Sequence, residues 1–186
     1  MVRTHISAFM ADDMAGDFDS KSCFAPVIGA KPRLLVLGSL PGDVSLAQRQ
    51  YYAHPTNQFW HLIGSVIGQD LAALPYAARL NALMARGIGL WDVIKTAQRP
   101  GSLDSQIRGH ETNPLAALVA ELPTLRAIAF NGATSAKIGQ QQLAVTTDMG
   151  QMRDLITLPS SSAAYCTINL EAKRARWRML STYLLP

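Results

Sequence analysis

The feature that most constrains the fold is a set of short apolar runs, each of which ends in a loop of small or polar residues. The first run, Leu34–Leu37, is continuous rather than alternating, and Gly38 follows it directly. A continuous run of this length is typical of a strand that is buried on both faces, as in a parallel sheet. The later segments that predict strands are Ile88–Ile94, Ala127–Phe130 and Asp154–Leu158. The sequence therefore predicts four strands.

Helical segments separate these strands. A helix is predicted from a cap at Thr56 or Asn57 to about Gly68, because apolar residues in this stretch recur on one helical face. The other predicted helices are Tyr76–Arg86, Pro114–Glu121, Ala133–Gln140 and a last one from Asn169 to about Leu184, and Arg99–Ile107 is predicted to be a loop. Alternating strands and helices indicate a parallel sheet covered on both faces. In such sheets ligands bind beyond the carboxyl ends of the strands, where the polar loops converge.

Length and composition limit the class of protein. A chain of 186 residues suits one domain with a sizeable core, and 48% apolar with 16% charged residues is a globular composition. No apolar run reaches the roughly 18 residues that a membrane span needs, and the first residues lack the compact apolar block of a secretory signal. We therefore expect a loosely held extension over residues 1–20, a single domain over residues 21–186, and a cytoplasmic protein.

Cysteine content and charge narrow the class further. Cys23 and Cys166 are the only cysteines, which excludes a four-thiolate zinc or iron–sulfur site and favours a reducing compartment. The net charge is +4, and the stretch Glu171–Arg178 carries four cations and one anion. A basic helix of this kind favours a polyanionic partner, although a solvated helix face remains the alternative.

The most informative motif spans Gly38–Trp60, where GSLPG is followed by YYAHPTNQFW. Supporting blocks are CFAP (Cys23–Pro26), GIGLWDVIK (Gly87–Lys95), GSLDSQI (Gly101–Ile107), FNG (Phe130–Gly132) and LPSSS (Leu158–Ser162). From about Lys21 to the C-terminus, these ordered blocks resemble the uracil-DNA glycosylase superfamily, and within it the hypoxanthine-DNA glycosylase (DNA-deoxyinosine glycosylase) family. The resemblance implies an α/β protein, a three-layer α/β/α sandwich around a four-stranded parallel sheet. It also implies a monomer that hydrolytically removes a damaged base from DNA, leaves an abasic site, and uses no metal or other cofactor.

The resemblance also implies the residues of the site. Asn57 and Asn131 are the expected catalytic residues, because their amides can position water or hydrogen-bond the base. A helix cap is the alternative role for Asn57, and a turn residue the alternative for Asn131. An amide is no general base, so catalysis would rest on positioned water and on stabilising the departing base. The residues expected to bind substrate are Gly38, Ser39, Leu40, Pro41, Gly42, Tyr52, His54, Phe59, Ser160, Ser161 and Ser162.

One of these residues departs from the superfamily pattern. Much of the superfamily has a carboxylate or asparagine where this chain has Leu40, and a leucine side chain cannot orient water. The hypoxanthine branch shares this departure, which argues for hypoxanthine over uracil. The alternatives are a mismatch uracil or xanthine glycosylase on the same scaffold, and a non-catalytic module that binds DNA lesions.

The remaining side chains have structural alternatives as well. Tyr52 is expected to stack on the extruded base, whereas Phe59 also fits the core face of its helix. His54 is interpreted mainly as a residue that shapes the junction between loop and helix. The serines at 160–162 and the cations of 173–178 are expected near DNA phosphates. Asp92 and Asp104 are interpreted as structural acids, and neither is assigned a catalytic role.

Overall fold

The computed structural model describes residues 20–144 and 153–185. The strands are β1 (Ser20–Ser22), β2 (Leu34–Gly38), β3 (Ile88–Asp92), β4 (Ile94–Gln98), β5 (Arg108–Thr112), β6 (Ala127–Asn131) and β7 (Asp154–Leu158). The helices are α1 (Asp43–Gln48), α2 (Phe59–Ile67), α3 (Tyr76–Ala85), α4 (Leu115–Ala120), α5 (Ala133–Ala144) and α6 (Leu170–Arg178), with 3-10 turns at Asp104–Gln106 and Met179–Leu184. Within the described ranges, none of these helices has the length and apolar character that crossing a membrane requires.

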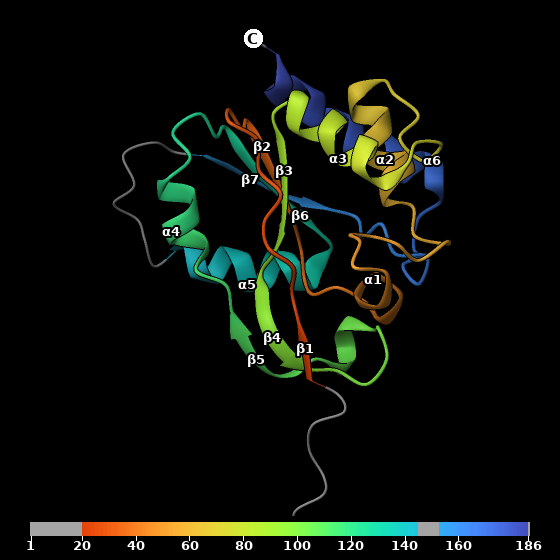
Figure 1. Ribbon diagram of the computed structural model, residues 1–186, viewed down its shortest axis with the longest axis vertical. Coiled ribbons are helices and arrows are strands. Elements are labelled where there is room, and N and C mark those ends of the chain that lie inside the picture. The colour runs from red at the N-terminus through yellow and green to blue at the C-terminus, as the bar shows by residue number, and fades with distance from the viewer. Residues whose placement is uncertain (1–19, 145–152, 186) are drawn as a thin grey trace, which may run out of the picture.

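The central sheet has the strand order β3-β2-β6-β7, and all neighbouring pairs are parallel (Figure 1). Leu34 lies opposite Ile88 on one side and Ala127 on the other. Every residue of β2, β3 and β6 is buried, whereas most of β7 is exposed at the edge of the sheet. The predicted four-stranded parallel sheet is therefore confirmed.

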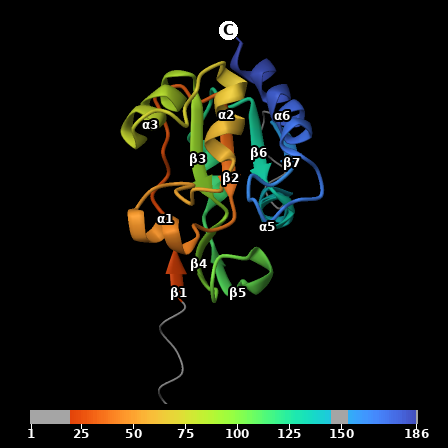
Figure 2. The same ribbon diagram turned by 90° about the vertical axis from the view of Figure 1, so that its right-hand side faces the viewer.

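Two apolar layers cover the two faces of this sheet, as the alternation of side chains along a strand requires. Leu34 and Val36 belong to a core cluster with residues of α2, α3 and α6, which lie together at the upper end of Figures 1 and 2. Leu35 and Leu37 belong to a second cluster with residues of α4 and α5 on the opposite face. The arrangement is the three-layer α/β/α sandwich that the sequence predicted.

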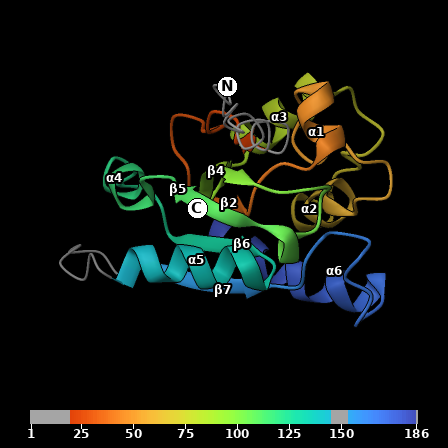
Figure 3. The same cartoon turned by 90° about the horizontal axis from the view of Figure 1, so that it is seen from below.

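A small antiparallel sheet of order β1-β4-β5 was not predicted. The segment Ile88–Ile94, predicted as one strand, is divided at Val93: β3 ends at Asp92, and β4 leaves the central sheet to pair with β1 and β5. Figure 1 shows this small sheet at the carboxyl end of β3, and Figure 3 shows β4 and β5 next to each other from below. All residues of β5 are exposed, so it carries no apolar pattern that a sequence could reveal. Ser20 belongs to β1, and the rest of the expected extension lies outside the described residues.

The helix boundaries differ from the expected ones in several places, and α5 continues to Ala144 rather than ending at Gln140. The α2 helix begins at Phe59 with Gln58 as its N-cap, later than the expected caps, and the side chain of Asn57 accepts a hydrogen bond from the Phe59 N–H. Asn169 caps α6 as predicted, through a bond from the N–H of Ala172. The predicted last helix is α6 followed by a 3-10 turn. Helix α1, in the loop after β2, was not predicted.

Gly139 allows α5 to approach β6 closely. A Cβ at this position would overlap the ring of Phe130. Alanine normally stabilises a helix by about 1 kcal/mol relative to glycine, but overpacking a core costs about 1–3 kcal/mol. We expect Gly139→Ala to lower the free energy of unfolding by about 1–2 kcal/mol, measured by urea denaturation. The control is Lys137→Ala at an exposed position of the same helix, and a stabilised Gly139→Ala variant would contradict this packing.

Candidate functional site

A cavity of about 570 Å³ opens at the carboxyl ends of the central strands. Its walls come from the loops that follow β2, β4, β6 and β7 and from the segment between α1 and α2, with Asp92 at the end of β3. This is the edge at which the sequence predicted the informative loops to meet. A smaller concavity of about 340 Å³ lies at the amino ends of β2 and β6, where Arg33 and Arg126 donate to the carbonyl of Leu185. The larger cavity is therefore the one that can carry chemistry.

Nearly all of the expected site residues line this cavity. They are Gly38, Ser39, Leu40, Pro41, Gly42, Tyr52, His54, Asn57, Asn131, Ser160, Ser161 and Ser162. The exception is Phe59, which was expected to bind substrate but is 0% exposed in the core. Its ring stacks on that of Tyr52, with centroids 3.7 Å apart and an interplanar angle of 12°. Phe59 therefore supports Tyr52 from behind.

Tyr52 has a backbone conformation that bulky residues rarely adopt, with φ 54°. Hydrogen bonds on both sides hold it there: the N–H of Tyr51 donates to the Tyr76 hydroxyl, and the N–H of Ala53 donates to the Ser45 hydroxyl. The ring is partly buried, with one face against Phe59. This strained turn places Tyr52 in the lining of the cavity, with its ring stacked on Phe59.

A buried arginine holds the loop after β2. Arg99 donates to the carbonyls of Leu40 and Pro41 and lies 3.6 Å from a carboxylate oxygen of Asp104. Asp104 in turn accepts a hydrogen bond of 2.7 Å from the Ser39 hydroxyl. The Leu40 side chain is only 6% exposed and packs in the core on the α4–α5 side. Leu40 therefore contributes mainly backbone to the cavity wall. The sequence analysis assigned no role to Arg99, because an arginine in a polar loop is usually exposed to solvent.

Asp92 lies at the floor of the cavity, as the last residue of β3 and in register with Gly38 of β2. A Cβ at Gly38 would overlap Oδ1 of Asp92 and lie 3.0 Å from the hydroxyl of Tyr52. Glycine at this position thus allows the carboxyl and the hydroxyl to approach each other over the end of β2. Asp92 is only 3% exposed. Its Oδ2 has no hydrogen-bond partner among the described residues, and the Tyr52 hydroxyl has only a weak interaction with the Asn131 side chain.

Burial dominates the electrostatics of this floor. It raises the pKa of Asp92 to about 7, against a lowering by Arg99 and with a further increase from Asp104. Burial also raises the pKa of Tyr52, and the nearby Asp92 raises it further. Near neutral pH the Asp92 carboxyl is therefore divided between its acid and ionised forms. The sequence interpretation of Asp92 as an ordinary structural acid missed this environment.

The two asparagines are held differently. Asn131 is bound at both ends by Ser161: its Nδ2 donates to the hydroxyl at 2.8 Å, and its Oδ1 accepts from the backbone N–H at 2.8 Å. Asn57 accepts one bond of 3.0 Å from the N–H of Phe59. The structure gives the Nδ2 of Asn57 no partner within residues 20–144 and 153–185. The cap contact therefore fixes the amide of Asn57 while its NH₂ group stays available in the cavity.

His54 stands at the rim, where its side chain is exposed. Its Nδ1 accepts a bond of 3.3 Å from the N–H of Thr56, and its carbonyl accepts one of 2.9 Å from the N–H of Asn57. These contacts shape the turn before α2 and orient Asn57. They match the junction-shaping alternative better than an acid–base role.

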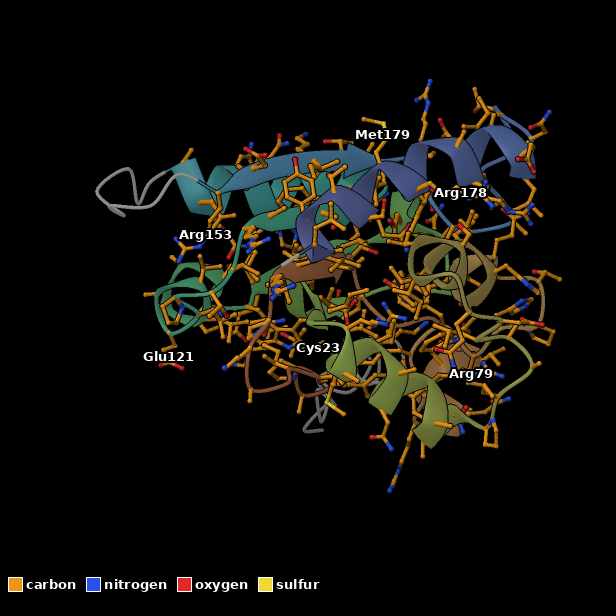
Figure 4. All side chains as sticks on the ribbon, turned by 90° about the horizontal axis from the view of Figure 1, so that it is seen from above. Cys23, Arg79, Glu121, Arg153, Arg178 and Met179 are labelled. Atoms are coloured by element: carbon orange, nitrogen blue, oxygen red, sulfur yellow. The ribbon has the colours of Figure 1, made fainter. Side chains whose placement is uncertain are left out.

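The loop after β7 forms the opposite part of the rim, and a buried lysine anchors it. Lys173, expected near phosphates, is only 1% exposed, and it donates to Oε1 of Gln58 at 2.9 Å and to the carbonyl of Ser162 at 3.1 Å. Ser161 is buried, so its hydroxyl serves Asn131 and has no access to a phosphate at the surface. Arg176 and Arg178 are exposed on α6, and Figure 4 labels Arg178 near Met179, which is also exposed. In residues 20–144 and 153–185, no three His, Cys, Asp or Glu side chains gather closely enough to hold a metal ion.

The buried carboxyl predicts how stability depends on pH. Because the pKa of Asp92 rises from 3.8 to about 7 on folding, its contribution to stability is fully present below about pH 4 and is lost as the pH rises toward 7. At about pH 8 we expect the free energy of unfolding of Asp92→Asn to exceed that of the wild-type protein by up to about 4 kcal/mol. Near pH 4 we expect no such gain. Urea denaturation at both pH values measures this, with the exposed Asp70→Asn as control; equal differences at the two pH values would contradict it.

Comparisons with known proteins identify one family and several similar proteins. A family model described as the uracil DNA glycosylase superfamily matches residues 25–181. The chain is 40% identical over 144 residues to a protein of Methanosarcina acetivorans named hypoxanthine DNA glycosylase, covering 77% of this chain and 87% of that protein. A protein of the same name from Methanosarcina barkeri is 48% identical over 115 residues, which are 62% of this chain and 73% of the relative.

A solved structure agrees with these sequence matches. A candidate uracil DNA glycosylase from Methanosarcina acetivorans, determined by NMR in solution, superposes with a TM-score of 0.77 at 34% identity. The match covers 89% of this chain and 98% of that one. Together with the family model, it establishes that the chain belongs to the uracil DNA glycosylase superfamily.

Proposed function

We propose that this protein is a monofunctional DNA glycosylase that flips a deaminated base, foremost hypoxanthine, out of DNA and hydrolyses its N-glycosidic bond. The observation that carries the proposal is the cavity at the ends of the parallel strands, where an aromatic ring and the free amide of Asn57 converge. Two relatives named hypoxanthine DNA glycosylase support the choice of base. The product is an abasic site, and a single domain over residues 21–186, acting as a monomer, carries the activity.

The aromatic floor suits an extruded base. Tyr52 offers one ring face to the cavity while Phe59 supports the other. Stacking on an aromatic ring tolerates different bases, because every base has a π face. The polar groups around the ring then decide which base is released.

The absence of a polar side chain at Leu40 favours a good leaving group. Nothing at that position can deprotonate water, so the reaction depends on positioned water and on the stability of the departing base. Hypoxanthine spreads the developing negative charge over O6 and its rings. The N-terminus of α5, which begins beside the cavity at Ala133, adds a partial positive charge that favours this anion.

Asn57 is the residue proposed to position water. The bond between C1′ of the sugar and the base breaks, and its electron pair leaves with the base. Water adds to C1′, its second proton passes to solvent, and the base takes up a proton in return. Asn57 has one oxygen lone pair and its NH₂ group free to hold that water, because the bond from the Phe59 N–H uses only part of its capacity.

DNA is the proposed partner on the face that carries the cavity. The protein has a net charge of +4 and exposes Arg176 and Arg178 on α6. Exposed cations bind phosphates without reading sequence, which suits an enzyme that searches for a lesion. The half-buried Ser160 and Ser162 remain available to a phosphate at the rim.

Base release from defined oligonucleotides tests this function. We expect the protein to convert a duplex containing deoxyinosine into abasic product, detected as strand breaks after alkali, and to act more slowly on deoxyuridine and deoxyxanthosine under single-turnover conditions. Preference for uracil or xanthine would favour the mismatch glycosylase alternative. Binding to an abasic-site analogue without release of any base would favour the non-catalytic alternative and refute the proposal.

Removing the Asn57 amide separates catalysis from binding. We expect Asn57→Ala to slow base release by about 100-fold, because positioned water is lost, while affinity for the duplex stays the same. The matched control is Asn169→Ala, which removes an asparagine that caps α6 away from the cavity. Single-turnover rates and a gel-shift titration measure the two effects. Unchanged release by Asn57→Ala would remove this residue from the mechanism.

A further inference from the structure

We infer that Asp92 contacts the extruded base and acts in its acid form, donating a hydrogen bond to a carbonyl oxygen of the departing base. This inference rests on the proposed function and adds a catalytic residue to it. It also makes base release depend on pH, because only the acid form of a carboxyl can donate.

Two buried polar groups at the cavity floor carry the inference. Oδ2 of Asp92 has no hydrogen-bond partner among the residues described, and the hydroxyl of Tyr52 has only a weak interaction with the Asn131 side chain. Oδ1 of Asp92 and the Tyr52 hydroxyl both lie against the place that a Cβ of Gly38 would occupy, so the carboxyl and the hydroxyl lie close together. Native structures rarely leave buried polar groups unsatisfied, and such groups at a cavity point to a ligand that completes their bonding. A base stacked on Tyr52 would present its polar edge to both.

The depth of Asp92 determines which part of the nucleotide it meets. Asp92 ends a buried strand at the cavity floor, whereas Asn57 is half-exposed and His54 lies at the rim. The base is the part of an extruded nucleotide that enters deepest, and the sugar stays nearer the DNA. Asp92 is therefore placed against the base edge, and Asn57 is closer to the reacting sugar carbon. This placement argues against a role for Asp92 as the general base that takes a proton from the attacking water.

The charge that develops in the reaction favours the acid form. As the bond to C1′ breaks, the base gains negative charge, which an ionised carboxylate would repel and an O–H donor would stabilise. Deamination replaces an exocyclic amino group with a carbonyl oxygen. A donor at the floor therefore meets an acceptor that hypoxanthine, xanthine and uracil share. Asp92 keeps its proton throughout, and the departing base takes its proton from solvent.

The charged and titratable groups around Asp92 set its protonation. Arg99 favours the ionised form, but its guanidinium is already bound to the Leu40 and Pro41 carbonyls. Asp104 favours the acid form. The neutral groups Tyr51, Tyr52 and Cys23 also interact with Asp92. Burial outweighs Arg99 and brings the pKa to about 7, and a bound base that excludes water favours the acid form further.

The pH profile of base release tests the inference. Single-turnover release from a deoxyinosine duplex is measured between about pH 5.5 and about pH 8 for wild type, Asp92→Asn and Asp92→Ala. We expect the wild-type rate to fall about tenfold from pH 6 to pH 8 as the carboxyl ionises. Asp92→Asn, whose neutral amide still donates, should lose this pH dependence and be faster than Asp92→Ala by at least about tenfold. The exposed Asp70→Asn serves as control and should follow the wild-type profile.

A second variant covers the case in which Asp92→Ala fails to fold. Asp104→Asn removes a carboxylate that favours the acid form of Asp92, so its profile should move to lower pH than that of wild type. A rate that rises with pH, or an Asp92→Asn variant as inactive as Asp92→Ala, would identify Asp92 as a base or a purely structural group and overturn the inference. Either result leaves the glycosylase function standing. If wild type releases no deaminated base at any pH, the proposed function fails, and the inference fails with it.

Discussion

The site depends on the close approach of β2 and β3 at their carboxyl ends. Parallel pairing places Asp92 level with Gly38, and the missing side chain at Gly38 is what admits the carboxyl and the Tyr52 hydroxyl above it. Burial of that carboxyl in an apolar sandwich then brings its pKa near neutrality. Strand register, a glycine and core packing thus combine to produce a titratable group at the cavity floor. The surrounding loops complete a site whose most unusual chemistry comes from the sheet itself.

The sequence predicted the parts of the fold that carry a strong pattern. Short apolar stretches that end in polar loops predicted all four central strands, and the Asn169 cap predicted the start of α6. The small sheet was missed because β5 is exposed throughout and because β4 continues an apolar stretch that looked like the end of β3. Hydrophobic periodicity mainly reports burial, so a strand such as β5, in which every residue is exposed, leaves no apolar pattern in the sequence.

The sequence also predicted only part of the site. Motifs located the cavity wall, whereas Asp92, Arg99 and Lys173 owe their roles to burial and to partners that are distant in sequence. For the asparagines, the structural and catalytic interpretations proved compatible. The backbone bond that makes Asn57 resemble a cap also orients its amide, and Ser161 fixes Asn131 in the same way. A structural contact and a chemical role are therefore not exclusive at these positions.

The buried Lys173 links parts of the molecule that are distant in sequence. Its ammonium group binds Gln58, which lies beside Asn57, and also the carbonyl of Ser162 on the other part of the rim, while its backbone belongs to α6. The same helix exposes Arg176 and Arg178 to solvent. The ammonium group thus holds α6 to both parts of the cavity rim, beside the bond from the Gln58 N–H to the Ser161 carbonyl. The opening of the cavity is therefore framed by segments that are fastened to one another.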